Sequence, residues 1–129
     1  MERILADTSF LIAAVRVQDS MHKRAVELYN NEMKLIIPVF VLQEFVTFLE
    51  NRDGRDVAYA EGAKILDSEA SVVLIQKEDM IPILAILKKY TGLSFCDASN
   101  IFMMKELKIE KILSFDPDFD QITGIERIF

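Results

Sequence analysis

The chain has 129 residues, 51% of them hydrophobic and 28% charged, which suffices for one domain with a filled core over residues 1–129. Its 21 acidic and 15 basic side chains give a net charge of -6. This charge argues against a general nucleic-acid coat protein, which would present a broad basic surface to phosphates, but bound cations could offset it in a nuclease. The apolar runs are too short to span a membrane and the single cysteine, Cys96, cannot form an internal disulfide, so we expect a cytosolic protein.

Short apolar runs alternate with stretches of helical periodicity along the whole chain. The expected strands are residues 4–6, 34–37, 71–75, 110–114 and 125–128. The expected helices are residues 9–15, 21–33, 39–51, 56–68, 77–90 and 95–107. This alternation predicts an α/β fold in which a parallel sheet of four to five strands is covered by helices on both faces.

Capping residues and prolines set the expected helix boundaries. Ser20 and Ser94 are the expected N-caps of their helices. Pro38 suits a first helical turn, where its missing N–H would have no partner, and Pro82 is tolerated if its helix begins just before it or kinks there. In helix 56–68 five apolar side chains are expected to pack inward: Val57, Ala60, Ala63, Ile65 and Leu66.

Two aspartates directly follow expected strands. Asp7 comes after the first strand and Asp116 after the fourth. In an open parallel sheet the carboxyl ends of the strands form the crevice where ligands bind, so both acids are candidates for a site. Each also has a purely structural interpretation, Asp7 as a helix N-cap and Asp116 as part of an Asp-Pro-Asp turn. Asp118 and Asp120 are expected to be turn or surface residues.

Two further acids lie on helices. Glu44 has apolar neighbours one helical turn away except for Thr47, and a solvent-facing glutamate is not expected there. A buried carboxylate is costly unless it is paired or metal-bound; the alternative is an edge residue that reaches water. Asp97 follows Ser94 at the spacing of a capping box, which competes with a functional role, and Asn100 would share its face one turn later. Cys96 is expected to be a packing residue.

Four carboxylates that converge on one edge of a sheet would repel one another, which raises their pKa values unless cations intervene. Oxygen ligands suit Mg²⁺ or Mn²⁺, whereas zinc is disfavoured by the presence of only one histidine and one cysteine. Such metals serve phosphoryl chemistry, in which they polarise the phosphate and activate water. The chain has neither a Gly-x-x-x-x-Gly-Lys loop nor a Gly-x-Ser-x-Gly elbow.

The acids lie in four segments: Ile4 to Leu11 with Asp7-Thr8-Ser9, Gln43-Glu44-Phe45, Asp97-Ala98, and Leu113 to Phe119. Over essentially the whole chain these segments resemble the PIN-domain ribonucleases, especially VapC-type toxins. The resemblance implies a three-layer α/β/α sandwich with strand order 3-2-1-4-5. It also implies a Mg²⁺- or Mn²⁺-dependent endoribonuclease whose metal-binding acids match Asp7, Glu44, Asp97 and Asp116.

The same resemblance implies supporting residues and partners. Ser9 and Ser114 match hydroxyls that support the metal-binding acids, and Asn100 is a candidate to add an amide behind them. The role of Asp118 is left open, because this acid contributes only in some members of the family. A homodimer and inhibition by a small antitoxin are also implied.

These assignments give a hypothesis of mechanism. Asp7, Asp97 and Asp116 hold the principal metal ion, and Glu44 holds or orients a second ion or the attacking water. The water then cleaves an RNA phosphodiester bond.

RNA also needs positive surface near such a site. Arg16, Lys23 and Arg24 follow the first strand closely enough to flank the cleft, and Arg52 and Arg55 form a second basic group. These five side chains are the expected RNA contacts, with plain solvated helix faces as the alternative.

Other functions fit the acids less well. A response-regulator receiver domain carries adjacent acids after its first strand, where this chain has only Asp7, and a haloacid-dehalogenase-type phosphatase needs an acid where this chain has Ser9. A better alternative is a catalytically silent PIN-like domain that acts as an RNA- or protein-binding module.

Overall fold

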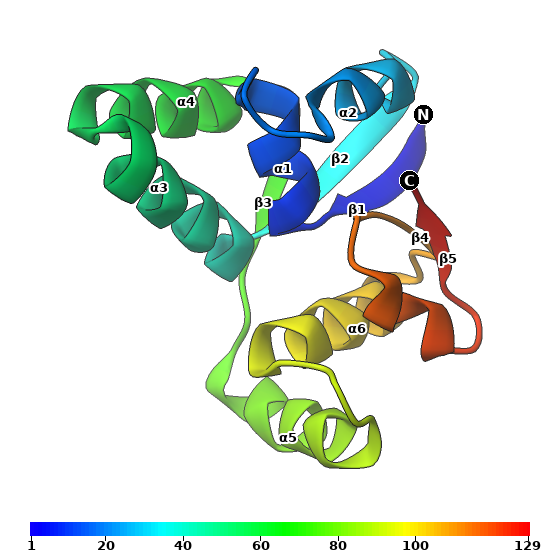
Figure 1. Ribbon diagram of the computed structural model, residues 1–129. Helices are drawn as coiled ribbons and strands as arrows, with labels where there is room; N and C mark the ends of the chain where they lie inside the picture. Colours follow the sequence, from blue (N-terminus) through cyan, green and yellow to red (C-terminus); the bar gives the residue numbers. More distant parts are fainter.

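A parallel five-stranded sheet forms the centre of the computed structural model, which describes residues 1–129 (Figure 1). The strand order is β3-β2-β1-β4-β5, and every neighbouring pair is parallel. The predicted α/β fold and strand order are therefore confirmed. The strands are β1 (Glu2–Ala6), β2 (Met33–Pro38), β3 (Ser71–Val73), β4 (Lys111–Leu113) and β5 (Glu126–Ile128).

Helices cover both faces of the sheet, because successive side chains of a strand point to opposite faces. Ile4 and Ala6 of β1 join one buried cluster with residues of α1 and α3, whereas Leu5 joins a second cluster with residues of α5 and α6. In Figure 1 α1, α2 and α4 lie in the upper part of the molecule and α3 at its left, whereas α5 and α6 lie below the sheet. The helices are α1 (Thr8–Val15), α2 (His22–Leu28), α3 (Val39–Asp53), α4 (Arg55–Asp67), α5 (Met80–Lys89) and α6 (Phe95–Leu107).

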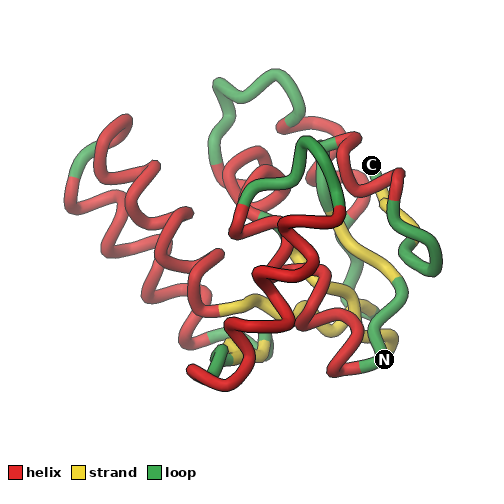
Figure 2. Tube along the Cα trace, turned by 90° about the horizontal axis from the view of Figure 1, so that it is seen from below, coloured by secondary structure: helices red, strands yellow, loops and turns green.

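Helices α3 and α4 run side by side as a helical hairpin, and Gly54 forms the turn between them (Figure 2). Gly54 has a φ of 97°, in the left-handed region that glycine tolerates, and this ends α3 where the sequence predicts it. The predicted inward face of α4 is right only at Ile65, which packs against a buried cluster. The other four predicted side chains, Val57, Ala60, Ala63 and Leu66, are exposed, and Ala58 and Gly62 are buried instead. Gly62 lies against Val46 of α3, so the two helices approach each other at a residue without a side chain.

Several helix boundaries differ from the predicted ones. The helix expected over 21–33 ends at Leu28, and Met33 instead begins β2. Met21 occupies the N-cap position of α2 instead of Ser20, because the Asp19 carboxylate accepts the Met21 N–H at 2.8 Å. Pro38 ends β2 and precedes α3. The helix expected over 77–90 divides into a 3-10 turn, η1 (Lys77–Asp79), and α5, which places Pro82 in a first turn whose N–H groups need no intrahelical partner. No helix combines the length and hydropathy that a membrane crossing requires.

Candidate functional site

Asp7 is the most buried acid of the chain, at the junction of β1 and α1, with only 8% of its surface exposed. Its backbone occupies the N-cap position of α1, but its side chain makes no capping hydrogen bond. The carboxylate instead accepts hydrogen bonds from Ser9 Oγ at 3.2 Å, Ser114 Oγ at 2.8 Å and Asn100 Nδ2 at 3.2 Å. The capping interpretation of the Asp7 side chain is therefore wrong, since its oxygens accept hydrogen bonds from side chains of α1, of α6 and of the residue that follows the neighbouring strand β4.

The two hydroxyls are oriented by the backbone that follows β4. The Phe115 N–H donates to Ser9 Oγ at 3.1 Å, and the Asp116 N–H donates to Ser114 Oγ at 3.0 Å. Because each hydroxyl oxygen accepts one of these bonds, its own proton is free to point at Asp7. The structure thus brings together Asp7, Ser9 and Ser114 from β1, α1 and the end of β4.

Burial raises the pKa of Asp7 to about 6. The hydrogen bond from Ser114 opposes this shift, and the negative charge of Asp97 adds to it. No lysine or arginine forms an ion pair with Asp7, so nothing on the protein compensates the charge of this buried carboxylate. A bound cation would supply that compensation.

Asp97 lies in the first turn of α6 and forms the predicted capping box with Ser94. The Asp97 N–H donates to Ser94 Oγ at 3.0 Å, and the Ser94 N–H donates to Asp97 Oδ2 at 3.0 Å. Burial raises the pKa of Asp97, and the charges of Asp116 and Asp118 raise it further. The structural role of Asp97 is therefore confirmed, and the same side chain lies within electrostatic reach of the acids after β4.

Asp116 is the N-cap of the 3-10 turn η2 (Pro117–Gln121). Its Oδ1 accepts the Asp118 N–H at 2.9 Å, which confirms the predicted turn. Asp116 is half-buried and Asp118 is exposed. Asp120 points elsewhere, because both of its oxygens accept N–H groups of Arg127 at 2.9 Å.

Glu44 lies on α3 and is exposed, so the prediction that it does not face solvent is wrong. Its neighbours Phe40 and Phe48 are only half-buried and line a cleft together with Glu44 and Cys96. Burial raises the pKa of the Cys96 thiol to about 11, and the negative charges of Glu44 and Asp97 contribute. Cys96 therefore lies within electrostatic reach of Glu44 on α3, a contact between distant segments that its sequence context did not reveal.

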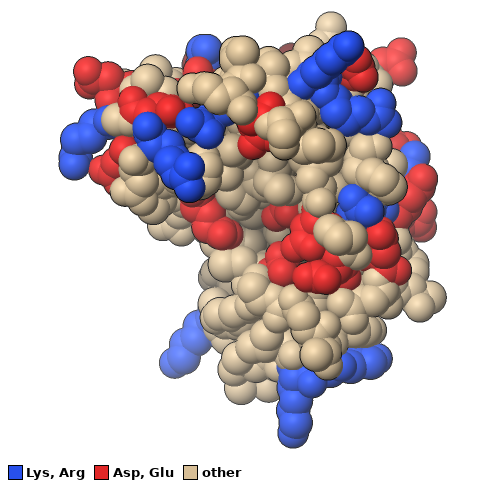
Figure 3. All heavy atoms as spheres, viewed as in Figure 1, with Lys and Arg blue, Asp and Glu red and all other residues tan.

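No three His, Cys, Asp or Glu side chains are placed so that they could hold a metal ion as they stand. Two other observations suit a divalent cation. None of the four predicted ligands takes part in an ion pair. Asn100 Oδ1 is buried without a hydrogen-bond partner, so an oxygen ligand beside Asp7 is left over. Figure 3 shows acidic side chains gathered beside the hollow that separates the upper helices from α6.

A family model described as "PIN domain" matches residues 4–125. The chain belongs to the PIN-domain family. The match takes in all four predicted ligands and almost the whole sheet, and it agrees with the resemblance found in the sequence. Comparison with curated proteins gives no match.

Solved structures of VapC-type toxins share the fold of this PIN domain. The Mycobacterium tuberculosis toxin VapC20, described as cleaving the sarcin-ricin loop, is 26% identical, with a TM-score of 0.81 over 91% of this chain and 92% of that one. A DNA-bound VapBC complex from Salmonella typhimurium is 16% identical, with a TM-score of 0.73 over 99% and 98% of the two chains. A toxin-antitoxin complex from Klebsiella pneumoniae is 18% identical, with a TM-score of 0.67 over 95% of each chain. The resemblance to VapC-type PIN domains is confirmed.

The predicted RNA contacts lie in different surroundings in this PIN domain. Arg16 donates two hydrogen bonds to Asp53, at 2.8 and 3.1 Å, so its guanidinium ties the end of α1 to the end of α3. Lys23 is exposed on α2, and Arg24 on the same helix donates to the Phe129 carbonyl at 2.8 Å. RNA contact by the exposed side chain of Lys23 and by Arg24 stays a prediction. Arg16 has a structural role, because its guanidinium is paired with Asp53.

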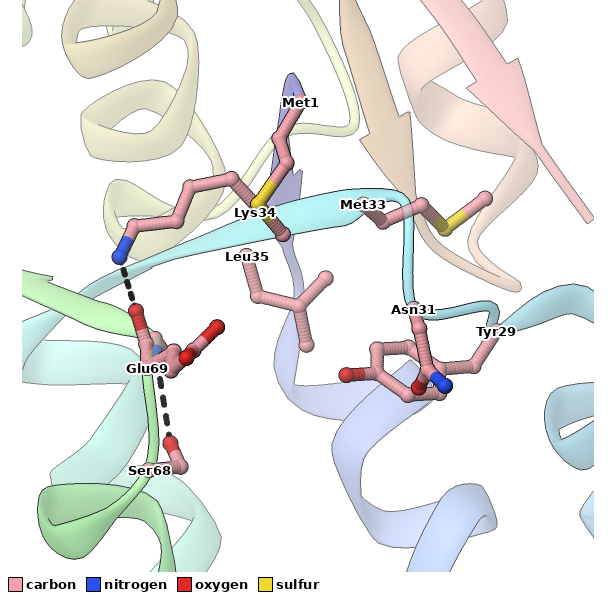
Figure 4. Close-up of a pocket in the computed structure, with 9 residues that line it drawn as sticks. Met1, Tyr29, Asn31, Met33, Lys34, Leu35, Ser68 and Glu69 are labelled. Carbon is pink, nitrogen blue, oxygen red and sulfur yellow. Dashed lines mark hydrogen bonds between the residues drawn. The ribbon is translucent and has the colours of Figure 1, made fainter.

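A second cavity, of about 180 Å³, lies at the opposite edge of the sheet (Figure 4). It is bordered by Tyr29, Met33 and Lys34 near the start of β2, and Lys34 Nζ donates to the Glu69 carbonyl there. Its one acid is Glu69. Ligands of open parallel sheets bind beyond the carboxyl ends of the strands, so this cavity is not the candidate site.

Proposed function

We propose that this PIN domain is a Mg²⁺- or Mn²⁺-dependent endoribonuclease that hydrolyses RNA phosphodiester bonds, as the toxin of a type II toxin-antitoxin pair. The observation that carries the proposal is Asp7, a buried carboxylate with three hydrogen-bond donors and no cation. PIN nucleases generally use divalent metal ions, and VapC-type toxins are nucleases. Membership of that family and the likeness to a toxin described as cleaving RNA support the same reaction.

In the proposed mechanism Asp7, Asp97 and Asp116 would hold the principal metal ion, and Glu44 would hold or orient a second ion or the attacking water. The bound metal supplies Lewis-acid polarisation of the phosphate and a water of lowered pKa. The surrounding residues of the protein hold the carboxylates in position.

Ser114 and Asn100 fix the two oxygens of Asp7 separately, since Ser114 donates to Oδ2 and Asn100 to Oδ1. Ser9 adds a second donor on Oδ2. The capping box fixes Asp97 through one oxygen and leaves the other available. These hydrogen bonds order the carboxylates before a ligand binds. Binding therefore costs little additional side-chain entropy.

A small antitoxin is the proposed protein partner. The similar structures from Klebsiella pneumoniae, Rickettsia felis and Salmonella typhimurium are toxin-antitoxin complexes, and the last two are described as bound to DNA. A homodimer is proposed as well, and exposed apolar side chains such as Ile81 and Leu84 on α5 would suit a protein contact.

Digestion of total RNA with Mg²⁺, with Mn²⁺ and with a chelator, followed by mapping of the new ends, tests the proposal. Asp7→Asn keeps the shape of the side chain but removes its charge, so we expect a folded protein without metal-dependent cleavage. Asp56→Asn is the matched control, because Asp56 is an exposed acid of α4 outside the site. Full activity of the Asp7 variant would refute the assignment.

The silent alternative gives a different result. A PIN-like domain that only binds RNA or protein would cleave nothing in either metal, and Mn²⁺ would not bind in an Asp7-dependent way. Titration of the metal-free protein with Mn²⁺, in parallel with the Asp7→Asn variant, separates the two functions.

A further inference from the structure

A cleft of about 510 Å³ opens beside Glu44, along the side of α3 that faces the start of α6. This volume lies in the usual range of small-ligand sites. It adjoins the proposed metal site, because Glu44 and Cys96 belong to its lining. The lining residues are Phe40, Gln43, Glu44, Thr47, Phe48, Asn51 and Cys96.

The lining of this cleft follows the helical repeat of α3. Phe40, Glu44 and Phe48 are four residues apart and form one stripe, and the polar residues of the lining form a second stripe beside it. The face of α3 that packs into the core is a third, separate set of residues, Val41, Phe45 and Leu49. The cleft is therefore a distinct face of the helix with its own composition.

The polar stripe is free to bind a ligand. Gln43, Thr47 and Asn51 are exposed, and none of their side chains makes a hydrogen bond within the protein. Two amides and a hydroxyl supply both donors and acceptors at one edge of the cleft. The two phenylalanine rings beside them are half-buried, so they are already ordered by packing before a ligand arrives.

The charges around the cleft differ from one end to the other. Glu44, one of the proposed metal ligands, lies between Phe40 and Phe48 along α3. Beyond Phe48, Arg52 lies over the ring of that residue, with its guanidinium carbon 5.0 Å from the ring centre. A polyanion that passes from the metal site along α3 would thus meet a cation beyond the aromatic rings.

We propose that this cleft binds one unstacked base of single-stranded RNA next to the bond that is cleaved. The inference rests on the proposed ribonuclease function and names the form of its substrate. Sequence-specific proteins hold splayed RNA bases by stacking on aromatic side chains and by hydrogen bonds to the base edges, and this lining offers both. Phe40 provides an apolar surface for the base, and Gln43 and Thr47, which lie one helical turn apart, bond its edge.

A protein segment fits a different surface of the molecule better. The groove between α1 and α2, of about 260 Å³, is lined by apolar residues alone, including Phe10, Val26 and Tyr29. The cleft beside Glu44 instead mixes aromatic rings with unpaired amides, as base recognition requires.

The test uses a short single-stranded RNA that spans a mapped cleavage site. Its affinity is measured by fluorescence anisotropy for Asp7→Asn, which does not cleave, and for double variants that add Phe40→Leu or Gln43→Ala. We expect the added change to weaken binding about tenfold, since one stacked base contributes roughly 1–3 kcal/mol. The matched control adds Tyr59→Leu, an exposed aromatic residue on α4 outside the cleft, and should leave the affinity unchanged.

Kinetics distinguish this inference from the proposed function. In the otherwise unaltered protein, Gln43→Ala should raise KM and blur the base preference at the cleavage site, with kcat little changed, because the base contact is remote from the reacting atoms. If both variants cleave RNA with unchanged KM and bind it with unchanged affinity, the proposal that the cleft binds a base is wrong, but the proposed nuclease function is not. Absence of cleavage in every metal would overturn the nuclease, and the anisotropy comparison would still decide whether the cleft binds RNA.

Discussion

Asp7 follows β1, and Asp120 lies in the turn η2 after the neighbouring strand β4, but the two carboxylates differ in whether a cation is paired with them. Asp120 accepts two hydrogen bonds from Arg127, and this pairing lowers the pKa of its carboxyl. Asp53 is paired with Arg16 in the same manner and its pKa is also lowered. Asp7 has hydroxyl and amide donors but no cation, and burial raises its pKa to about 6.

The presence or absence of an arginine partner distinguishes two groups of acids. One group forms ion pairs that join elements of the fold, and the other has no cation partner and could bind a ligand. Arg16 and Arg127 tie together helices and strand ends, so their partner aspartates are neutralised within the protein. The four proposed metal ligands lack such partners. A raised pKa of about two units corresponds to roughly 3 kcal/mol of destabilisation when Asp7 is ionised, and a bound cation would recover that energy.

The largest expected effect concerns Asp7 in the metal-free protein. The native state keeps its proton up to a pH of about 6, whereas the unfolded chain releases it near 3.8. The contribution of Asp7 to stability therefore falls as the pH rises through this window and stays low above it. Asp7→Asn removes the charge, so at neutral pH with a chelator it should raise the free energy of unfolding by up to roughly 3 kcal/mol.

Urea denaturation across this pH window measures the effect, with Asp56→Asn as the control. With saturating Mn²⁺ the order should reverse, because only the unaltered protein gains stability from the metal. An Asp7→Asn variant that is less stable than the unaltered protein under chelation would contradict the proposed cost of the buried charge.

Local sequence patterns predicted most of the fold and part of the site. Short apolar runs and helical periodicity identified all five strands and the main helices, while the strand order came from the family resemblance. Ser94 and Asp97 showed their capping box because both partners lie within one helical turn. The positions of Asp7 and Asp116 after strands followed from the alternation alone.

Features that depend on packing between distant elements were not predictable. Glu44 is exposed because α3 buries the face formed by Val41, Phe45 and Leu49, and which apolar face of the helix meets the core depends on its packing against other elements. Arg16 and Asp53 are 37 positions apart, and no local pattern links them. The predicted inward face of α4 was right at Ile65 but missed Ala58 and Gly62, which become buried only when the helix packs against the rest of the fold.

A smaller effect is expected at Arg127, on the paired side of the comparison. Its guanidinium also donates to the Ser114 carbonyl at 3.3 Å and lies 3.7 Å from the centre of the Phe129 ring. Arg127→Gln should lower the free energy of unfolding by roughly 1–3 kcal/mol, because hydrogen bonds of a charged group are lost. It should also weaken Mn²⁺ binding, since Ser114 orients Asp7.

Thermal denaturation and Mn²⁺ titration test this link, with Asp120→Asn as the matched change. The Asp120 variant keeps the bond from Arg127 to the Ser114 carbonyl, so its affinity for Mn²⁺ should fall less. Equal Mn²⁺ affinities for the Arg127 variant and the unaltered protein would show that the arginine stabilises the fold without positioning the site.

The smallest effect is expected at Asp53, whose pair with Arg16 lies away from the proposed metal ligands. Because Arg16 lowers the pKa of Asp53, the pair contributes stability above the ordinary value of 3.8, and this contribution is lost as the pH falls through the lowered value. Asp53→Asn should therefore reduce the melting temperature by at most a few degrees at neutral pH and by less in acid. Mn²⁺ affinity and RNA cleavage should not change, because a charge that is neutralised within the fold is not available to the site. A loss of Mn²⁺ binding in this variant would show that the two groups of acids are coupled and would remove the distinction between them.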